Sequence, residues 1–420
     1  MKDKIKKRLA QIRAGKIPEG YKKGKIGIVP DDWEEIIFSE LFTSTSEYTD
    51  DLEKYPLYSL TIEDGITAKT ERYDRSHLVK KENSYKIVRP NDFAYNPMNI
   101  RFGAVARHKG EMPVSVSGYY DIFTTVHESD LSFMEGFLTS NSMITYYNRV
   151  STGSLVEKQR VHFSDFMRFS IPLPPLEERK KIAEILTMQD KVIELCERKI
   201  EQLKRIKKYY LQNMFPKGGE EYPEIRFKGF TDPWEQRKLS DLIIEYKETV
   251  DSECDLPVLT SSKTEGVVLQ EEHFGRKQQH DITGYNILPR GYCTYRNRSD
   301  GVDFTFNINK CCDKGIISKF YPVFYGNNSD VFFISLVLNH SEEVVHEIGY
   351  TCTGTGQKVL SFLDLQKMHI TVPSYDEQKK IANYFEQLDS LITLHQRKCE
   401  EEKKKKKALQ QMLLTGIVRV

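Results

Sequence analysis

The segment that decides the fold reads Ile171-Pro172-Leu173-Pro174-Pro175-Leu176-Glu177-Glu178-Arg179-Lys180-Lys181-Ile182-Ala183. A second copy follows about 200 positions later, as Val372-Pro373-Ser374-Tyr375-Asp376-Glu377-Gln378-Lys379-Lys380-Ile381-Ala382. In the first copy two prolines precede two glutamates, and the first turn of a helix favours both the fixed φ angle and the negative charge. In the second copy Ser374 and Glu377 have the spacing of a capping box. We therefore expect one long helix to begin at each copy.

The repeat extends over the whole chain. Equivalent positions at nearly the same separation are Trp33 and Trp234, Gly65 and Gly266, Arg75 and Arg276, Tyr85 and Tyr285, Tyr95 and Tyr295, and Thr152-Gly153 and Thr353-Gly354. Repeats of 20 to 50 residues would indicate a solenoid, whereas one repeat of about 200 residues predicts two similar domains in a pseudo-twofold molecule.

Composition bounds the class of protein. The chain has 420 residues, 39% of them hydrophobic, which is enough for two or three domains with buried cores. It has no run of 18 apolar residues and no apolar leader, so we expect a cytoplasmic protein without a membrane span. Seven scattered cysteines, including the adjacent Cys311 and Cys312, favour reduced structural thiols over a metal site. The net charge of +1 does not decide whether nucleic acid binds, because the placement of the charges matters.

Each copy has two unlike parts. The first part is rich in Tyr, Phe, Val, Gly and Asn, and its short alternating runs at residues 112–117 and 315–320 predict strands. The expected fold class is therefore α/β (α+β), with two similar domains separated by two long helices. The predicted parts are a basic helix and lead-in (1–30), a first domain (31–170), a central helix (171–216), a linker (217–230), a second domain (231–370) and a C-terminal helix (371–420).

The two helices need partners along an apolar stripe. No Gly or Pro occurs from Glu177 to Met214, so the first helix could reach roughly 55 Å. An imperfect heptad stripe predicts an antiparallel coiled coil that holds the two domains apart. For the lysines at 403–407 we favour a solvated helix face over a DNA contact. The predicted stripe residues are Ile182, Ile185, Gln189, Val192, Cys196, Lys199, Leu203, Ile206 and Tyr210 in the first helix, and Ile381, Tyr384, Leu388, Leu391, His395, Leu409 and Met412 in the second.

Catalytic motifs are missing from the sequence. Tyr95-Asn96-Pro97-Met98 lacks the second proline and the aromatic residue of the amino-methyltransferase signature, so a structural loop or a DNA contact is favoured there. The glycine-rich run at 353–358 lacks the ending that cradles phosphate, and the ten histidines form no metal-binding pair. We expect a protein that is not an enzyme and has no catalytic or metal-ligating residues.

Several segments together resemble the specificity subunits of type I restriction-modification systems. Residues 20–34 are similar to the N-terminus of that family, residues 225–239 to the start of its second target-recognition half, and residues 171–183 and 372–382 to the openings of its conserved regions. The similarity covers almost the whole chain and includes the order of the parts. One departure is Arg179, which stands where the second copy has Gln378; we interpret this exchange as harmless.

The resemblance implies an adaptor that reads an asymmetric, bipartite DNA site, with one target-recognition domain per half-site. It implies double-stranded DNA, two modification (methyltransferase) subunits and two restriction (translocase and endonuclease) subunits as partners. The chain itself would hold no cofactor, and S-adenosylmethionine, ATP and Mg²⁺ would bind to the partners. Two alternatives stay open: a non-catalytic two-domain scaffold, and a DNA-binding module of another DNA-modification enzyme.

Candidate DNA contacts follow from the repeat, because two copies that read different half-sites should share phosphate contacts and differ in base contacts. Beside the shared tyrosines, Arg suits guanine and Asn suits adenine in the major groove, whereas the tyrosines themselves fit the core better. The predicted backbone contacts are Arg75, Thr152, Gly153, Lys158, Arg160, Arg276, Thr353, Gly354 and Lys358, and the predicted base contacts are Asn96, Asn99, Arg101, Arg296, Asn297 and Arg298.

Overall fold

The computed structural model describes residues 2–68, 84–153, 159–251, 253–276, 281–301, 303–354 and 357–420. The chain divides into two compact units. Unit 1 comprises Met1–Glu197 and Arg397–Val420, and unit 2 comprises Arg198–Gln396. Both divisions fall inside long helices, α6 (Leu176–Asn213) and α12 (Tyr375–Leu414), and each helix begins inside one of the two repeated helix-start segments.

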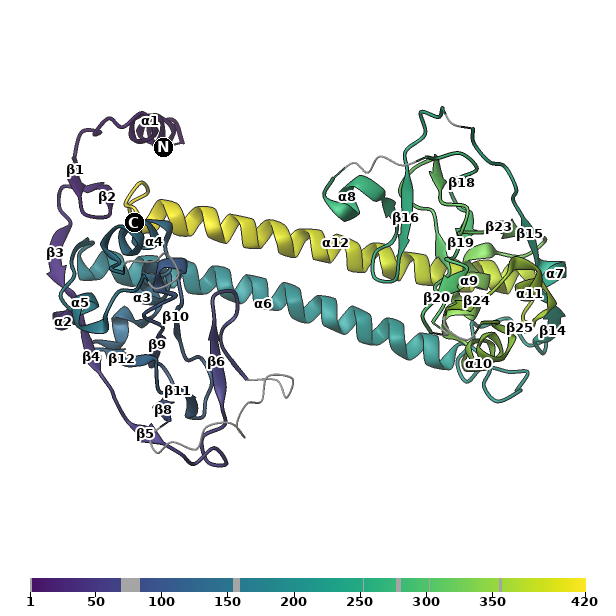
Figure 1. Cartoon of the computed structure of the whole chain (residues 1–420), viewed down its shortest axis with the longest axis horizontal. Helices are drawn as coiled ribbons and strands as arrows, with labels where there is room; N and C mark the ends of the chain where they lie inside the picture. Colours follow the sequence, from purple (N-terminus) through teal and green to yellow (C-terminus); the bar gives the residue numbers. More distant parts are fainter. Residues whose placement is uncertain are drawn as a thin grey trace. The chain divides into compact units, whose positions relative to one another are not determined.

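Unit 1 is a mixed domain of short antiparallel strands and short helices (Figure 1). Its elements besides α6 and α12 are α1 (Lys2–Arg13), β1 (Tyr21–Gly24), β2 (Gly27–Pro30), β3 (Glu34–Ile37), α2 (Phe38–Leu41), β4 (Phe42–Ser44), β5 (Tyr48–Thr49), β6 (Tyr58–Thr61), β7 (Gly65–Ala68), β8 (Tyr85–Val88), β9 (Phe93–Tyr95), η2 (Ile100–Phe102), β10 (Val105–Arg107), β11 (Val114–Ser117), β12 (Asp121–Thr125), η3 (Glu128–Asp130), α3 (Leu131–Leu138), α4 (Asn141–Val150), α5 (Phe163–Phe166) and β13 (Ser170–Leu173).

Unit 2 has a similar order of strands and helices. They are β14 (Glu235–Lys238), α7 (Leu239–Leu242), β15 (Ile243–Glu245), β16 (Leu259–Ser262), β17 (Gly266–Leu269), α8 (Gln270–Phe274), β18 (Asn286–Pro289), β19 (Cys293–Thr294), β20 (Arg298–Ser299), β21 (Asn307–Ile308), β22 (Lys314–Ile317), β23 (Val323–Gly326), α9 (Val331–His340), α10 (Glu342–Thr351), β24 (Lys358–Val359), α11 (Phe362–Lys367) and β25 (His369–Val372). The strands expected at 112–117 and 315–320 are confirmed as β11 and β22.

The sheets of the two units have the same plan. A four-stranded antiparallel sheet has the order β10-β9-β12-β4 in unit 1 and β21-β19-β23-β15 in unit 2. In each unit the first strand after the repeated tryptophan pairs with the strand that leads into the long helix, as β3 with β13 and β14 with β25. The first and last strands of each domain therefore lie side by side, directly before the long helix begins.

Each core is built around one tryptophan. Trp33 is fully buried in unit 1, together with Leu413 and Leu414 from the end of α12. Trp234 is buried in unit 2, together with Met214 and Phe215 from the end of α6. Residues at or just after the end of one long helix therefore complete the core of the domain that precedes the other.

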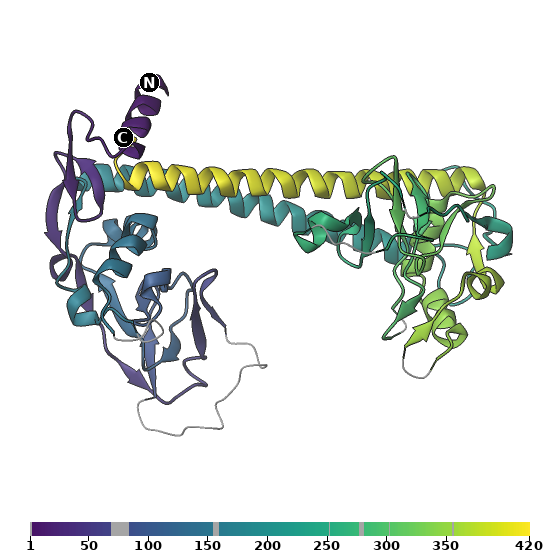
Figure 2. The same ribbon diagram turned by 45° about the horizontal axis from the view of Figure 1, so that its top comes forward.

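Within each unit, α6 and α12 pack side by side and antiparallel (Figure 1, Figure 2). In unit 1, Gln189 donates to a carboxylate oxygen of Glu402 over 2.6 Å, and Lys403 pairs with Glu197. In unit 2, Lys207 donates to Asp389 over 2.6 Å. The coiled coil predicted from the sequence is therefore present in each unit.

The predicted stripe is wrong by one residue at alternate positions. Val192 and Ile206 are both 41% exposed, whereas Leu203 is 4% exposed. The same shift occurs in α12, where Leu391 is exposed while Phe385 and Ile392 are buried. A stripe of buried and half-buried positions spaced by three and four residues runs along each helix, at 182, 186, 189, 193, 196, 200, 203, 207 and 210 in α6 and at 381, 385, 388, 392, 395, 399, 402, 406, 409 and 413 in α12.

The start of each long helix is fixed by a pair of buried polar side chains. Arg179 donates to both carboxylate oxygens of Asp130 and to the carbonyl of Pro174. Its counterpart Gln378 accepts the amide N–H of Asp330 and donates to the carbonyl of Pro373. Both residues link the start of a long helix to position 130 or its counterpart 330, Arg179 through the carboxylate of Asp130 and Gln378 through the backbone amide of Asp330.

The capping box expected at α12 is not what holds Glu377. Both oxygens of its carboxylate accept hydrogen bonds from Arg226 instead, at 2.8 and 2.7 Å.

No helix in the described part of the chain combines the length and the apolar character needed to cross a membrane.

Candidate nucleic-acid interface

In unit 1 two loops are joined by the buried Tyr95. Its side chain is fully buried at the end of β9, and its hydroxyl donates to the carbonyl of Val161 over 2.9 Å. The amide of Val161 donates in turn to the carbonyl of Pro97. These contacts bring the loop that follows β9 against the loop that follows α4. Two of the predicted groups of contact residues are therefore neighbours in space.

The loop after β9 uses its predicted residues in different ways. Asn96 is buried, and its side-chain oxygen accepts the amide N–H of Met98 over 3.1 Å, so this residue shapes the turn. Asn99 is exposed at the start of η2. Arg101 is half-buried, donates to the side-chain oxygen of Gln159 over 2.6 Å and lies 4.6 Å from the ring centroid of Phe102. Asn99 and Arg101 are therefore accessible to a ligand, whereas Asn96 is buried within the turn.

The loop after α4 is closed by a short antiparallel bridge. Thr152 and Arg160 exchange two backbone hydrogen bonds, each of 2.9 Å. Gly153 has a φ of 147°, in the region that favours glycine. Thr152 and Gly153 are exposed and Arg160 is half-buried, all at the same edge as Arg101. Lys158 and Arg75 lie outside the described residues.

Unit 2 repeats this arrangement. Tyr295 is fully buried, and its hydroxyl donates to the carbonyl of Leu360 over 3.1 Å. The backbones of Thr353 and Val359 exchange two hydrogen bonds, which closes the loop that follows α10. Both tyrosines were assigned to the core from the sequence, and this is confirmed. Burial raises the pKa of both phenols far above the usual value for tyrosine, so they act as hydrogen-bond donors.

The predicted contacts of unit 2 lie on this edge, with one exception. Arg298, in β20, pairs through its backbone with β24, the strand that contains Lys358. Arg296 is exposed, while Asn297 is half-buried and its backbone bonds to Phe320 and Leu360. Arg276 is exposed directly after α8, an element that packs on β16 and β17. The structure therefore groups Arg296, Arg298, Thr353, Gly354 and Lys358 and leaves Arg276 on a different element.

Each unit also presents an arginine stacked on an exposed phenylalanine. In unit 1 this is Arg101 over Phe102, and in unit 2 it is Arg298, 4.5 Å from the ring centroid of Phe320. The two rings are 49% and 38% exposed. Sequence reasoning missed both phenylalanines, since they do not occupy equivalent positions in the repeat.

The chemistry of this edge is that of recognition. Its groups are guanidinium, ammonium, amide and hydroxyl donors beside aromatic faces, which suit phosphates, base edges and stacking. Among the described residues no group of three His, Cys, Asp or Glu side chains is arranged to hold a metal ion.

Comparison with known proteins identifies the family. The family described as type I restriction modification DNA specificity domain matches residues 30–205 and again residues 231–403. The chain belongs to this family. It is a DNA specificity subunit of the type I restriction-modification class, with one specificity domain in each half of the sequence.

Similar proteins support the assignment. The type I restriction enzyme MjaVIII specificity subunit of Methanocaldococcus jannaschii is 24% identical over 427 residues, which cover 93% of this specificity subunit and 94% of the relative. The crystal structure of the type I restriction-modification system S subunit from M. genitalium has the same fold, with a TM-score of 0.55 and 12% identity over 91% of this chain and 96% of the other.

Proposed function

We propose that the subunit reads a bipartite, asymmetric DNA site, with one half-site per unit. The observation that carries this proposal is the duplicated edge. Each unit repeats the buried tyrosine, the Thr-Gly loop and the stacked arginine, but places different exposed side chains around them. A shared frame with different polar groups suits two domains that meet the same backbone and read different bases.

Within this proposal Arg101, Arg296 and Arg298 read bases, and Arg160 and Lys358 contact phosphates. An arginine that stacks on an aromatic ring has its guanidinium plane fixed, which favours bidentate contact with guanine. Loss of one such base contact costs about 1–3 kcal/mol of discrimination.

Methylation mapping with the assembled complex tests the assignment. Arg101→Ala is expected to relax one position in one half-site, and Arg298→Ala one position in the other. Arg237→Ala, an exposed change on strand β14, serves as the control and should leave both half-sites intact. If either arginine variant changes both half-sites, or neither, the division of labour between the units is wrong.

We further propose that the subunit performs no chemistry and recruits its catalytic partners in the cytoplasm. S-adenosylmethionine would bind to two modification subunits, and ATP and Mg²⁺ to two restriction subunits. The described residues that face the candidate interface include no metal cluster, and the buried phenols there are too basic for acid–base work at neutral pH.

The docking surface that best fits two identical partners is an exposed apolar stripe on each long helix. In unit 1 it consists of Met188, Val192 and Leu195 of α6, which are 67%, 41% and 63% exposed. In unit 2 it consists of Leu391 and Leu394 of α12, which are 38% and 61% exposed. The two stripes occupy equivalent positions of the repeat, so one kind of partner fits both.

Single and double substitutions test this docking proposal. Leu195→Asp or Leu394→Asp is expected to remove one modification subunit, and the double variant both, as measured by native mass spectrometry. Thr393→Asp places the same charge on the exposed surface beside the stripe and should leave assembly unchanged. Full assembly of the double variant would exclude these stripes as the docking surface.

A further inference from the structure

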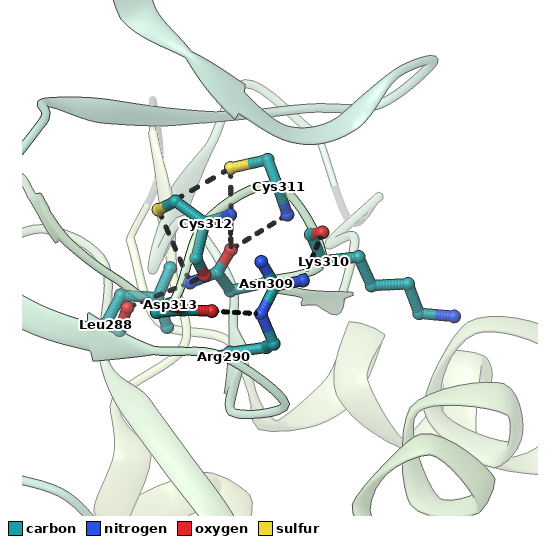
Figure 3. A network of polar contacts seen from close by, with 7 residues as sticks. All are labelled: Leu288, Arg290, Asn309, Lys310, Cys311, Cys312 and Asp313. Carbon is teal, nitrogen blue, oxygen red and sulfur yellow. Dashed lines mark hydrogen bonds and ion pairs between the residues drawn. The ribbon is translucent and has the colours of Figure 1, made fainter.

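The turn between β21 and β22 presents two neighbouring thiols on a rigid frame (Figure 3). Cys311 is exposed and Cys312 is half-buried, and their sulfur atoms lie 3.9 Å apart. Both are free thiols. The sequence favoured a structural role for them, but their exposure and mutual orientation point to a binding function.

Asn309 holds the backbone of the turn in place. Its side chain is fully buried, and its Oδ1 accepts the amide N–H groups of Cys311 and Cys312 at 3.1 and 3.4 Å. Its Nδ2 donates to the carbonyls of Leu288 and Cys312. One amide therefore fixes the peptide groups of both cysteines. It also contacts their sulfurs, since the Cys311 thiol donates to Oδ1 over 3.4 Å and Nδ2 donates to the sulfur of Cys312 over 3.9 Å.

Arg290 fixes the outer side of the same turn. Its Nε donates to Asp313 over 2.8 Å, and its Nη1 donates to the carbonyl of Lys310 over 2.8 Å. Lys310 itself pairs with Glu386 of α12 at 3.0 Å. The thiols are thus attached to a turn that is anchored on two sides.

The geometry disfavours a disulfide. Neighbouring Cα atoms are about 3.8 Å apart, which is shorter than the roughly 4.4–6.8 Å spanned by ordinary disulfides. A bond between these two sulfurs would strain the peptide group that Asn309 holds.

The same geometry suits a shared ligand. Two thiolates that share one centre, with bonds of about 2.3 Å, lie at most about 4.6 Å apart. The observed sulfur separation of 3.9 Å needs almost no adjustment. Since the described residues contain no third His, Cys, Asp or Glu grouped with the pair, the centre must be satisfied by few protein ligands.

We propose that Cys311 and Cys312 form a dithiol site for one soft, thiophilic centre of low coordination, such as trivalent arsenic or monovalent copper. Thiolate ligands select such centres over hard cations.

Binding is coupled to release of protons. Partial burial of the sulfur and then the neighbouring Cys312 raise the pKa of Cys311 to about 11, although the residue as a whole is exposed. A centre shared by both sulfurs removes the repulsion between two thiolates, whereas a reagent that takes one thiol does not. The pair should therefore prefer dithiol reagents to single-thiol reagents.

Phenylarsine oxide is the probe for the arsenical chemistry. Two arsenic–sulfur bonds form, the arsenic–oxygen double bond breaks, and the oxygen leaves as water with the two thiol protons, so that nothing is oxidised. Intact-mass analysis of the folded full chain is expected to show one adduct that survives washing with excess monothiol. The protein for this experiment carries Cys196→Ser, because Cys196 and Cys399 also lie close enough to interact.

Two single variants decide the site. Cys311→Ser and Cys312→Ser are each expected to lose the stable adduct, while Cys254→Ser, a change at another partly exposed cysteine, should keep it. Thermal unfolding of each variant confirms that the fold is intact, and Cys311→Ala provides a second substitution at the exposed position. An adduct that survives either serine variant would overturn the proposal.

A second experiment tests copper(I) binding by competition with the copper(I) chelator bicinchoninate. Removal of copper by the wild-type chain and not by Cys312→Ser supports a metal source, whereas arsenical capture alone supports an arsenical source. Failure of both probes on folded protein overturns the dithiol site, as does formation of a Cys311–Cys312 disulfide in air in place of either complex. None of these readouts involves DNA, so they stand apart from the test of sequence recognition.

Discussion

Arg419 donates two hydrogen bonds to the carboxylate of Glu178, at 2.6 and 2.8 Å, although 241 positions separate the two residues in the sequence. The equivalent carboxylate in unit 2, that of Glu377, is bound in the same way by Arg226. Glu178 lies at the start of α6, and Arg419 follows the end of α12. Each long helix therefore starts against an arginine that follows the other long helix.

Arg226→Ala is expected to destabilise unit 2 by about 3 kcal/mol. The carboxylate of Glu377 is 1% exposed, and loss of its partner leaves a buried charge uncompensated. The arginine side chain is itself 14% exposed, so water replaces it poorly. Chemical denaturation followed by tryptophan fluorescence measures the change, because Trp234 lies in the core of the same unit.

Two variants bracket this expectation. Arg419→Ala should cost less, because the Arg419 side chain is 36% exposed and water can partly solvate Glu178 after the change. Arg205→Ala removes an exposed pair with Glu201 on α6 and should cost well under 1 kcal/mol. An Arg226 variant as stable as the Arg205 variant would show that the buried pair does not hold the start of α12.

Gly354→Ala is expected to disrupt the loop after α10 and to lower DNA affinity through unit 2. An added Cβ would lie 2.3 Å from the carbonyl oxygen of Gln357, at a φ of 103° that side chains rarely adopt. Gly301→Ala, where the nearest atom would be 3.9 Å away, is the matched control. Equal DNA affinity for the two variants in a mobility-shift titration would mean that the loop does not contact DNA.

The phosphate contacts predict a uniform loss of affinity. Lys358→Ala and Arg160→Ala should weaken binding to every sequence alike and reduce the salt slope by about one each. Arg160 lies on the backbone bridge that closes the Thr152-Gly153 loop, and Lys358 precedes Val359, the residue that forms the bridge to Thr353. Binding isotherms at several salt concentrations provide the measurement. If a variant changes the preference at one base position and leaves the salt slope unchanged, the replaced residue contacts a base and not a phosphate.

The sequence predicts the repeat, the two helix starts and the pairing of the helices, because Trp33 and Trp234, and the two helix-start segments, recur at one separation. It does not predict which face of α6 is buried. Val192 and Ile193 are neighbours and both apolar, so the pattern alone does not choose between them. The buried stripe of α6 is the one that contains Leu203, whereas Met188, Val192 and Leu195 are exposed. Two apolar stripes on one helix are ambiguous in sequence because each stripe suits a separate partner.

The candidate interface is also only partly readable from the sequence. The Thr-Gly pairs and the two tyrosines mark its position, since these residues occupy equivalent places in both copies. The stacking of Arg298 on Phe320 joins residues from different strands, and the link between Arg101 and Gln159 spans 58 positions. Such contacts depend on tertiary packing, so no local sequence pattern predicts them.

Leu203→Asp and Ile206→Asp are expected to behave in opposite ways. Leu203 is 4% exposed, and an unpaired carboxylate there is costly, so unit 2 should lose much of its stability. Ile206 is 41% exposed, and its replacement should leave folding intact. Circular dichroism during thermal unfolding compares the two variants. Similar losses in both would show that the heptad register of α6 differs from that described.

The last prediction concerns pH and Asp92, a 6% exposed residue in the turn before β9. Burial raises the pKa of Asp92 above its ordinary value of 3.8, despite a hydrogen bond from the amide of Arg89. The folded state therefore holds the proton more tightly than the unfolded state. The stability that protonation of Asp92 adds is fully present at pH values below the ordinary pKa of aspartate. It is lost as the pH rises through the raised pKa of the folded state.

Asp92→Asn retains a side-chain oxygen for the Arg89 amide and removes the charge. The melting temperature of the variant relative to wild type is expected to rise between pH 4 and pH 7, because only the wild type must bury a carboxylate at neutral pH. The exposed change Asp64→Asn gives the baseline for loss of one surface carboxylate in the same unit. A difference between Asp92→Asn and wild type that falls with rising pH would mean that the ionised form of Asp92 is the one stabilised by the fold.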